Sequence, residues 1–489
     1  MQTLQEILVG VGVLVVFAAL LAVVALFFWN HSRKQSIPQK LKKHFRPTSL
    51  DSLTVTERQF PTHIRADLQH GVDEFLQDAT VCSFHGVQSQ MHGFGGVDFT
   101  SLLDESLINM TSSTGTGPPQ YEQIDIGEDE PIQALKNGMW LLKRGHIKFA
   151  VLYAPNSEFG ECGMSQRIRF QVATPNDDEG AAISRDFFKH LESEVLRARS
   201  YRGKILSLEQ GDAYSGEANG VKVHRLRRVE RDEVILPRKT LDLLDRNVIR
   251  FVERRQDLGE FKMATKKGIL FYGPPGTGKT HTIRYLAKSL AGHTTLLISA
   301  EQVGLLGEYM TLARLLQPSI VVIEDVDLIA RERTKMRNAG TELLLNKLLN
   351  EMDGLREDCE ILFILTTNRP EELEAALASR PGRIDQAIEF PLPDSEGREK
   401  LVRLYSRGVD VPDDVVQSIV KRTEKVSASF IKELMRRSAQ FHLERDGTRT
   451  LTLDDVENAL DEMLFSGGSL NLKLLGAEQR IDGETQEPG

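Results

Sequence analysis

The segment Gly273–Thr280, which reads GPPGTGKT, restricts the possible folds of this chain more than any other. It matches the phosphate-loop pattern G-x-x-x-x-G-K-[ST]. The apolar run Gly268–Tyr272 comes before it and the helix-forming segment His281–Leu290 comes after it, which is the strand, loop and helix order that such a loop requires. The predicted fold class is therefore α/β, with a P-loop NTPase parallel sheet that places the loop at the carboxyl end of a strand.

The loop is expected to hold the phosphates of a nucleotide. Its glycines allow backbone N–H groups to surround the β-phosphate, and the following helix N-terminus adds a partial positive charge. Lys279 should reach the β- and γ-phosphates, and Thr280 should ligate Mg²⁺. ATP and Mg²⁺ are the predicted cofactors. The predicted nucleotide-binding residues are Gly273, Pro274, Pro275, Gly276, Thr277, Gly278, Lys279, Thr280 and His281.

A second buried strand, Ser319–Ile323, ends in the acidic residues Glu324 and Asp325. Parallel α/β sheets bind their ligands at the carboxyl ends of the strands, so both carboxylates are expected near the loop. One acid is needed to hold Mg²⁺ through water and the other to orient the attacking water. The predicted metal-binding residues are Thr280, Glu324 and Asp325.

With these motifs in place, residues of about 232–465 resemble an AAA-type ATPase module. The usual order of the acidic pair in that family is Asp then Glu, whereas this chain has Glu324 then Asp325. By position, the resemblance implies that Asp325 is the catalytic carboxylate and Glu324 the Mg²⁺ partner. Each side chain differs by one methylene from the family pattern. The exchange of the two acids could therefore shift the attacking water and slow hydrolysis.

The same resemblance assigns further residues. The apolar strand Ile361–Leu365 ends in Thr366, Thr367 and Asn368, and Asn368 matches the family's sensor that contacts the γ-phosphate or its water. Arginines matching Arg380 and Arg383 reach the nucleotide of a neighbouring subunit, which implies a homo-oligomeric ring, by resemblance a hexamer. The predicted catalytic residues are Lys279, Glu324, Asp325, Asn368, Arg380 and Arg383.

Other segments match the family less closely. Val234–Pro237 lies where the family packs adenine, with an ordinary strand as the alternative, and Ser427–Ser429 lies where its lid helix begins. Glu301–Gln317 is shorter than the pore-loop region of threading relatives, and we predict that its Tyr309 packs in the core. A similarly short segment, an N-terminal span and a Glu-Asp pair occur in mitochondrial membrane ATPases that translocate a folded iron–sulfur protein. No H-E-x-x-H motif of a metalloprotease is present.

A membrane span is predicted at Ile7–Trp29, which contains no charged residue and would extend about 35 Å as a helix. A cleaved signal peptide is the less favoured alternative, because its apolar core is usually shorter. Basic residues follow the span, which places the N-terminus outside and the ATPase region in the cytoplasm. They are Arg33, Lys34, Lys40, Lys42, Lys43 and Arg46. The lack of an Arg-rich transit segment favours a bacterial plasma membrane over an organelle.

The 489 residues are predicted to form five segments. These are a transmembrane helix and basic linker (1–46), an α+β middle domain for a substrate or adaptor (47–225), the large ATPase subdomain (226–394), a helical lid (395–465) and a disordered tail (466–489). The net charge of −9 argues against nucleic acid as a partner. In the middle domain, Cys82, His85 and His92 lack a fourth ligand at zinc-like spacing.

These observations predict a membrane-anchored AAA ATPase that hydrolyses ATP to remodel or translocate proteins at the cytoplasmic face of a membrane. Its predicted partners are the lipid bilayer, further copies of itself and a protein substrate or adaptor. The alternative is a nucleotide-dependent membrane scaffold with little turnover, which the inverted Glu-Asp pair supports. Threading of a substrate and movement of a folded cargo both remain open.

Overall fold

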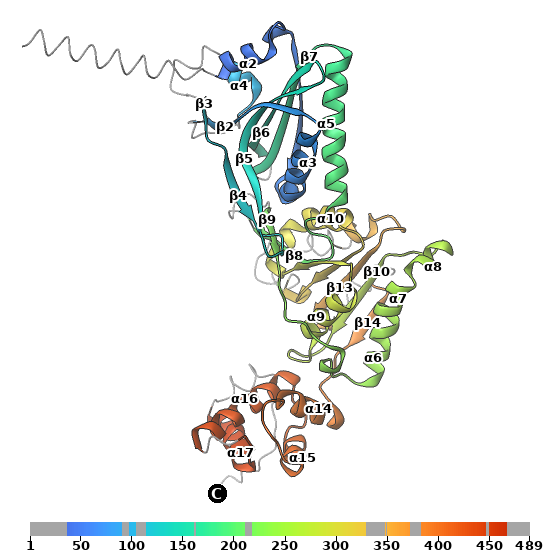
Figure 1. The fold of residues 1–489 in the computed structure, drawn as a ribbon. Helices are drawn as coiled ribbons and strands as arrows, with labels where there is room; N and C mark the ends of the chain where they lie inside the picture. Colours follow the sequence, from blue (N-terminus) through green and yellow to red (C-terminus); the bar gives the residue numbers. More distant parts are fainter. Residues whose placement is uncertain are drawn as a thin grey trace, which may run out of the picture. The chain divides into compact units, whose positions relative to one another are not determined.

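The computed structural model describes residues 37–89, 97–103, 114–160, 163–210, 218–328, 348, 350–371, 383–445 and 449–466. The chain divides into two compact units (Figure 1). Unit 1 comprises Met1–Ile124 and Ile132–Arg197, and unit 2 comprises Asp125–Pro131 and Ala198–Gly489. The predicted membrane span at 7–29 and the predicted tail beyond residue 466 lie outside the described residues. No helix in the described part of the chain is both long enough and apolar enough to cross a bilayer.

Unit 1 is built on a seven-stranded antiparallel sheet. The strand order is β1-β7-β6-β5-β2-β3, and β4 pairs with β5. The strands are β1 (Leu53–Pro61), β2 (Thr80–Ser89), β3 (Thr114–Gly117), β4 (Gln120–Ile124), β5 (Ile132–Arg144), β6 (Ile147–Gly160) and β7 (Gly163–Pro175). The helices are α2 (Ile37–Phe45), η1 (Leu50–Ser52), η2 (Thr62–Ile64), α3 (Arg65–Gln77), α4 (Phe99–Leu103) and α5 (Asp178–Arg197).

Helices cover both faces of this sheet because its strands alternate side chains between two apolar layers. On β6, Ala150 and Leu152 pack in one cluster with residues of α2 and α4. The neighbouring Phe149 points to the other face, where its ring meets Phe75 of α3 edge to face at 6.3 Å. Phe75 also meets Phe187 of α5 at 4.9 Å, so aromatic contacts hold α3 and α5 against the sheet.

Helix α2 corrects part of the sequence prediction. The basic stretch that includes residues 37–46 was expected to be a linker. Instead, Ile37, Leu41 and Phe45 recur every four residues, form one face of α2 and are buried in unit 1. Lys42 and Lys43 remain exposed. This basic segment therefore belongs to the fold of unit 1.

Unit 2 contains a second seven-stranded sheet, with the order β14-β10-β13-β12-β11-β8-β9. All neighbouring pairs from β14 to β8 are parallel, and the β8–β9 pair is antiparallel. The strands are β8 (Ile205–Gln210), β9 (Ala218–Val223), β10 (Lys267–Tyr272), β11 (Thr294–Ile298), β12 (Ser319–Ile323), β13 (Ile361–Thr367) and β14 (Gln386–Glu389). These bounds agree closely with the strands predicted around the two motifs.

The β8–β9 hairpin differs from the predicted domain boundary near residue 225. The predicted middle domain of residues 47–225 includes β8, but β8 pairs with β11 and extends the sheet of unit 2. Tyr309 stabilises this addition from the core: its hydroxyl accepts a hydrogen bond from Leu208 N at 2.8 Å and lies 3.1 Å from Leu297 O. The Tyr309 side chain is fully buried, so its predicted core position is confirmed.

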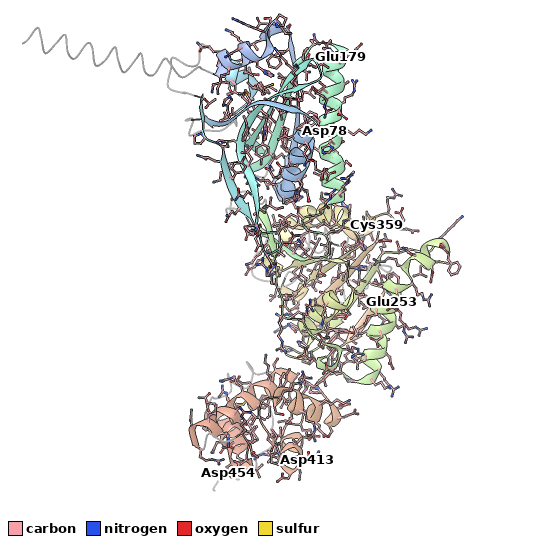
Figure 2. All side chains as sticks on the ribbon, in the orientation of Figure 1. Asp78, Glu179, Glu253, Cys359, Asp413 and Asp454 are labelled. Atoms are coloured by element: carbon pink, nitrogen blue, oxygen red, sulfur yellow. The ribbon has the colours of Figure 1, made fainter. Side chains whose placement is uncertain are left out.

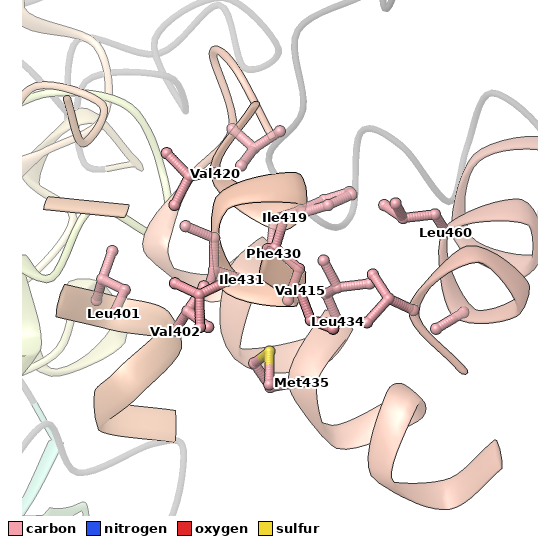
Figure 3. Close-up of a cluster of buried hydrophobic side chains, with 14 of the residues drawn as sticks. Leu401, Val402, Val415, Ile419, Val420, Phe430, Ile431, Leu434, Met435 and Leu460 are labelled. Atoms are coloured by element: carbon pink, nitrogen blue, oxygen red, sulfur yellow. The ribbon is translucent and has the colours of Figure 1, made fainter. Parts of the chain in front are cut away.

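Helices flank the sheet of unit 2 and form a separate lid after it. The first group is η4 (Arg231–Glu233), α6 (Arg238–Leu244), the π-helical turn η5 (Asp245–Ile249), α7 (Arg250–Glu253), α8 (Arg255–Glu260), α9 (Lys279–Ser289), η6 (Ala300–Leu305) and α10 (Leu306–Leu315). The lid comprises α14 (Ser395–Tyr405), α15 (Asp413–Arg422), α16 (Ala428–Arg445), α17 (Leu453–Asp461) and the π-helical turn η7 (Glu462–Ser466). Its apolar core, with Ile419, Phe430 and Leu434 at the centre, appears in Figure 3.

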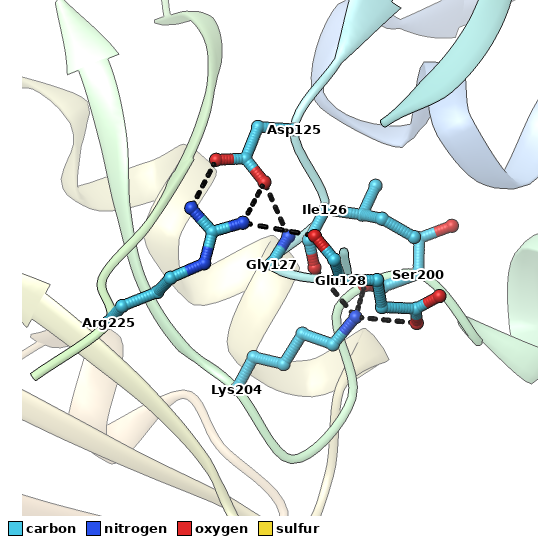
Figure 4. Close-up of polar contacts among 7 residues, drawn as sticks. All are labelled: Asp125, Ile126, Gly127, Glu128, Ser200, Lys204 and Arg225. Atoms are coloured by element: carbon cyan, nitrogen blue, oxygen red, sulfur yellow. Dashed lines mark hydrogen bonds and ion pairs between the residues drawn. The ribbon is translucent and has the colours of Figure 1, made fainter. Parts of the chain in front are cut away.

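The loop Asp125–Pro131 belongs to unit 2 although it connects β4 to β5 of unit 1. Figure 4 shows the polar contacts that hold it. Arg225 pairs with the Asp125 carboxylate at 3.0 Å and donates to the Glu128 carbonyl. Lys204 Nζ donates to the Ile126 carbonyl at 2.6 Å and to the Glu128 carboxylate at 3.0 Å. Ion pairs and hydrogen bonds thus bind this acidic loop to Lys204 and Arg225, which flank β8 and β9 of the unit 2 sheet.

The described cysteines, Cys82 and Cys359, are both free thiols. Cys82 is exposed, and Cys359 is half-buried close to the start of β13 (Figure 2). The described residues therefore contain no disulfide between these two cysteines.

Candidate active site

The phosphate loop connects β10 to α9, and its backbone requires glycine at two positions. Gly278 has a φ of +100° and immediately precedes α9, which begins at Lys279. Gly276 has a φ of +76°, and a Cβ there would lie 2.8 Å from Ser429 Oγ and 2.9 Å from Ser427 Oγ of the lid. Any larger residue would both strain the backbone and collide with the start of α16.

Lys279 is buried over the loop rather than extended into solvent. Its Nζ donates to the carbonyl of Gly273 at 2.7 Å and to that of Pro274 at 2.9 Å. Burial lowers the pKa of Lys279 to about 8, and the charges of Asp325 and Asp327 oppose this shift only partly. An ammonium group held this way is positioned to meet phosphate oxygens above the loop.

Thr280 and Glu324 face each other across the ends of α9 and β12. The Thr280 hydroxyl donates to Glu324 Oε1 at 2.7 Å. A hydroxyl, a carboxylate and the neighbouring Asp325 form an all-oxygen set, which is the donor chemistry that Mg²⁺ prefers. The residues predicted to bind the metal therefore fit the ion, and the structure brings the first two of them into direct contact.

Asp325 instead faces the strand β13. Asn368 Nδ2 donates to Asp325 Oδ1 at 3.0 Å, and the Asp325 amide donates to Thr366 Oγ1 at 3.0 Å. Asp325 has a φ of +50°, a conformation that is uncommon outside glycine. Burial, followed by the nearby charges of Asp327 and Glu324, raises the pKa of Asp325. A raised carboxylate pKa suits a proton acceptor.

Asp327 was not among the predicted site residues, yet it organises the end of β13. Its side chain is 3% exposed, and its Oδ1 accepts hydrogen bonds from Thr367 Oγ1 at 2.9 Å and from the Asn368 amide at 3.2 Å. Asp327 therefore fixes the backbone from which Asn368 reaches Asp325. The sequence offered only a weak signal for it, an acidic residue one position past an apolar one.

The two predicted arginine fingers have different outcomes. Arg380 lies outside the described residues. Arg383 is described, and it forms an ion pair with Asp353 of its own chain instead of approaching the phosphate loop. The structure therefore brings Lys279, Thr280, Glu324, Asp325 and Asn368 together at one sheet edge but leaves Arg383 apart from them.

Further contacts at the flanks of the loop complete the site. His281 Nε2 lies 3.2 Å from the carbonyl of Glu233, immediately before the segment Val234–Pro237. Arg407, which follows α14 and was not predicted, pairs with Asp232 at 2.6 Å and approaches Glu233 at 3.7 Å. From the lid, the Ser429 amide donates to the Gly276 carbonyl at 3.1 Å. Contacts from the lid thus reach both sides of the nucleotide-binding loop.

A cavity of ≈ 580 Å³ extends from Glu324 toward the β8–β9 hairpin. Lys222 and His224 of the hairpin line it together with Gln302 and Glu324. Ser207 and His224 are hydrogen bonded within it at 2.8 Å. The sequence did not reveal this space because it depends on β8 joining the sheet.

Comparison with known proteins identifies the region that carries this site. Residues 269–392 match the family described as "ATPase family associated with various cellular activities (AAA)". An ATP-dependent zinc metalloprotease FtsH of Thermus thermophilus is 32% identical over 252 residues, which cover 48% of this chain and 39% of that protein. A proteasome-activating nucleotidase of Methanopyrus kandleri is 36% identical over 214 residues, covering 40% of this chain and 48% of that protein. The chain spans less than half the length of these two relatives.

Proposed function

We propose that this chain, whose residues 269–392 form an AAA-type P-loop ATPase domain, hydrolyses ATP with the help of Mg²⁺. The observation that carries the proposal is the pairing of side chains at one sheet edge beside Lys279. Thr280 contacts Glu324, and Asp325 contacts Asn368, so the two acidic residues face different partners. That division matches the two tasks of the reaction, metal binding and activation of water.

In the proposed mechanism, Lys279 binds the β- and γ-phosphates after leaving its loop carbonyls. Thr280 and Glu324 hold Mg²⁺, which when bound neutralises negative charge on the β- and γ-phosphates. Asp325 accepts a proton from the attacking water, and its raised pKa favours this role. Asn368 orients that water and the Asp325 carboxylate through its side-chain amide.

The lengths of the two side chains explain how the inverted acidic pair can still work. Glu324, with the longer side chain, reaches Thr280, and the shorter Asp325, which has a positive φ, contacts Asn368 and Thr366. The exchange of a methylene between the two positions therefore leaves each carboxylate with a partner. We propose that the left-handed backbone at Asp325 compensates for its shorter side chain.

Assembly into a homo-oligomeric ring, by resemblance a hexamer, is part of the proposal. Arg380 and Arg383 would then contact the nucleotide of an adjacent subunit and stabilise charge on the transferred phosphoryl group. For Arg383 this requires the ion pair with Asp353 to open. The support is the position of both arginines after Asn368 in the sequence.

We further propose that the ATPase remodels or moves proteins at the cytoplasmic face of a membrane. Its relatives are named as a protease and a proteasome-activating nucleotidase, which supports protein substrates. The membrane anchor rests on the uncharged run Ile7–Trp29. Because Tyr309 is fully buried, it is not available to grip a threaded chain, which favours movement of a folded cargo.

A nucleotide-dependent scaffold is the second candidate, and the inverted Glu-Asp pair favours it. Such a protein would bind ATP and assemble but release little phosphate. The two candidates differ in a single measurable quantity, turnover in the assembled state.

The test is phosphate release by the purified full-length chain with ATP and Mg²⁺. We expect Lys279→Ala to reduce turnover by at least about 100-fold, since a cation that stabilises developing charge is removed. Lys288→Ala is the matched control, because Lys288 lies on the same helix but pairs with Glu230. Equal turnover of wild type and Lys279→Ala would overturn the enzymatic proposal, and assembly with negligible turnover of the wild type would establish the scaffold.

A further inference from the structure

Helices α3 and α5 of unit 1 approach each other closely at Gly71. A Cβ at that position would lie 3.0 Å from Leu191 Cδ2 and 3.3 Å from Glu194 Cβ. A glycine on α3 therefore allows α5 to pack against it at this point. One turn further along α3, Glu74 is carried to the same side of the helix pair as Glu194.

Three potential metal ligands converge there: Glu74, His190 and Glu194, with one ligand atom of each within 4.8 Å of the others. His190 and Glu194 are four residues apart on α5 and so share one face of the helix. Glu194 is 3% exposed, which is unusual for a residue with a carboxylate. His190 Nε2 is buried and has no hydrogen-bond partner in the described structure. A buried polar nitrogen without a partner is unfavourable unless something else binds it.

We propose that Glu74, His190 and Glu194 bind a divalent ion of the first-row transition metals, with Zn²⁺ as the type case. Water completes the coordination of the ion. One imidazole nitrogen and two carboxylate oxygens are established Zn²⁺ donors, whereas Mg²⁺ and Ca²⁺ prefer oxygen alone. Bonds of about 2.0–2.2 Å to one ion would bring donor atoms to within about 4.2 Å of each other. The observed spacing therefore requires only small side-chain rotations. The ion would connect α3 to α5.

Arg197 is the internal competitor for this ion. Its guanidinium forms an ion pair with Glu194 and lies 3.8 Å from Glu74. The Arg197 side chain is 51% exposed, so it can turn into solvent when a cation takes its place. The two positive groups would bind the same carboxylates, and removing one should strengthen binding of the other.

The first measurement is calorimetric titration of the chelator-treated full-length protein with ZnCl₂, in an excess of Mg²⁺ that occupies oxygen-only sites. We expect one tight Zn²⁺ site. His190→Gln and Glu74→Gln should each weaken Zn²⁺ binding by at least about 100-fold. That is the largest loss of affinity usually seen when a residue that only hydrogen-bonds to a metal ligand is changed. Arg197→Met should tighten Zn²⁺ binding. Circular dichroism tests whether each variant is folded. If His190→Gln is not folded, Glu74→Gln alone tests the proposal.

His146→Gln is the matched control. His146 also pairs with a glutamate, Glu179 at 2.9 Å, but its side chain is 82% exposed. This variant should bind Zn²⁺ as tightly as the wild type. A second readout is the visible absorption of bound Co²⁺, which should disappear in His190→Gln and persist in His146→Gln. Unchanged Zn²⁺ affinity in both ligand variants, or an equal loss in His146→Gln, would overturn the proposal and leave an ion-pair network only.

Discussion

The two units contain sheets of equal strand number but opposite construction, and only one of them gathers motif residues at its edge. In unit 2 the five strands from β14 to β11 are parallel, so their carboxyl ends share one edge. The phosphate loop, Glu324 and Asn368 follow three of these strands and therefore meet. In unit 1 every pairing is antiparallel, so successive strands end at opposite edges.

The difference extends to what stabilises each region. The edge of unit 2 contains a buried ammonium group at Lys279 and a left-handed backbone at Asp325, both unfavourable in themselves. The sheet of unit 1 is stabilised by apolar layers on both faces, with Trp140 stacked on Phe84 at 4.9 Å. Substitutions at the edge of unit 2 should therefore change the chemistry of the site and leave the fold intact. Substitutions in unit 1 should destabilise the fold and leave that chemistry unchanged.

Asp325→Asn should produce the largest effect. We expect turnover to fall by about 10²–10⁴-fold, the usual contribution of a general base, while ATP binding and folding stability persist. Phosphate release and equilibrium ATP binding measure the two quantities separately. Glu324→Gln is the companion variant and should mainly raise the Mg²⁺ concentration needed for activity. Turnover equal to that of the wild type would refute the role assigned to Asp325.

Leu152→Ala tests the opposite region. Leu152 is fully buried on β6, so its truncation should reduce the free energy of unfolding of unit 1 by about 2–5 kcal/mol. Trp140 lies in the same sheet and reports this transition by fluorescence in urea. Val55→Ala is the control, because Val55 is 40% exposed on β1. ATP affinity of Leu152→Ala, measured under native conditions, should stay unchanged. If it falls in parallel with stability, the proposed difference between the two units is wrong.

Tyr309→Phe should have a smaller effect that is confined to the edge of the second sheet. The variant leaves the Leu208 amide without its acceptor, which should destabilise unit 2 by about 1–3 kcal/mol. Amide hydrogen exchange at Leu208 should accelerate while ATP turnover remains normal. Tyr121→Phe, at an exposed position of unit 1, should change neither. Loss of turnover without faster exchange would indicate that Tyr309 acts in catalysis rather than in packing.

The smallest expected effect is a proton taken up with ATP. The pKa of Lys279 is lowered to about 8, so above that pH the amine is mostly neutral before ATP binds. The phosphates favour the charged form, and binding therefore draws a proton from the buffer at about pH 8.5–9 and almost none below about pH 7. Calorimetry in buffers of different ionisation enthalpy measures this uptake. Lys279→Arg should abolish it, and buffer-independent heats for the wild type would contradict the expected shift.

Much of the ATPase region could be predicted because its signals are local. The strand at Ser319–Ile323 has the same bounds in the structure, and the helix predicted from His281 begins two residues earlier, at Lys279. Short apolar runs bounded by glycine or acidic residues leave little freedom for such elements. Asp327 could not be predicted in this way, because its role depends on Thr367 and Asn368 at the end of β13, which lie far from it in the sequence.

Unit 1 shows the opposite case. The sequence predicted only an α+β domain there, and neither the packing of α2 on the sheet nor the pairing of β8 with β11 was predicted. Both depend on which apolar surface lies nearby after folding, and a linear pattern does not contain that information. The convergence of Glu74 on His190 and Glu194 is of the same kind, since it requires α3 and α5 to pack at Gly71.

The phosphate loop, the acidic strand end and the short strands that lead into them could be predicted from the amino-acid sequence alone, because each depends on residues adjacent along the chain. The partner of each acidic residue became visible in the folded chain, where Glu324 contacts Thr280 and Asp325 contacts Asn368. The tertiary structure also placed β8 in the second sheet and gathered the candidate ligands between α3 and α5. These contacts join distant residues, so they arise from packing and backbone geometry that no local pattern specifies.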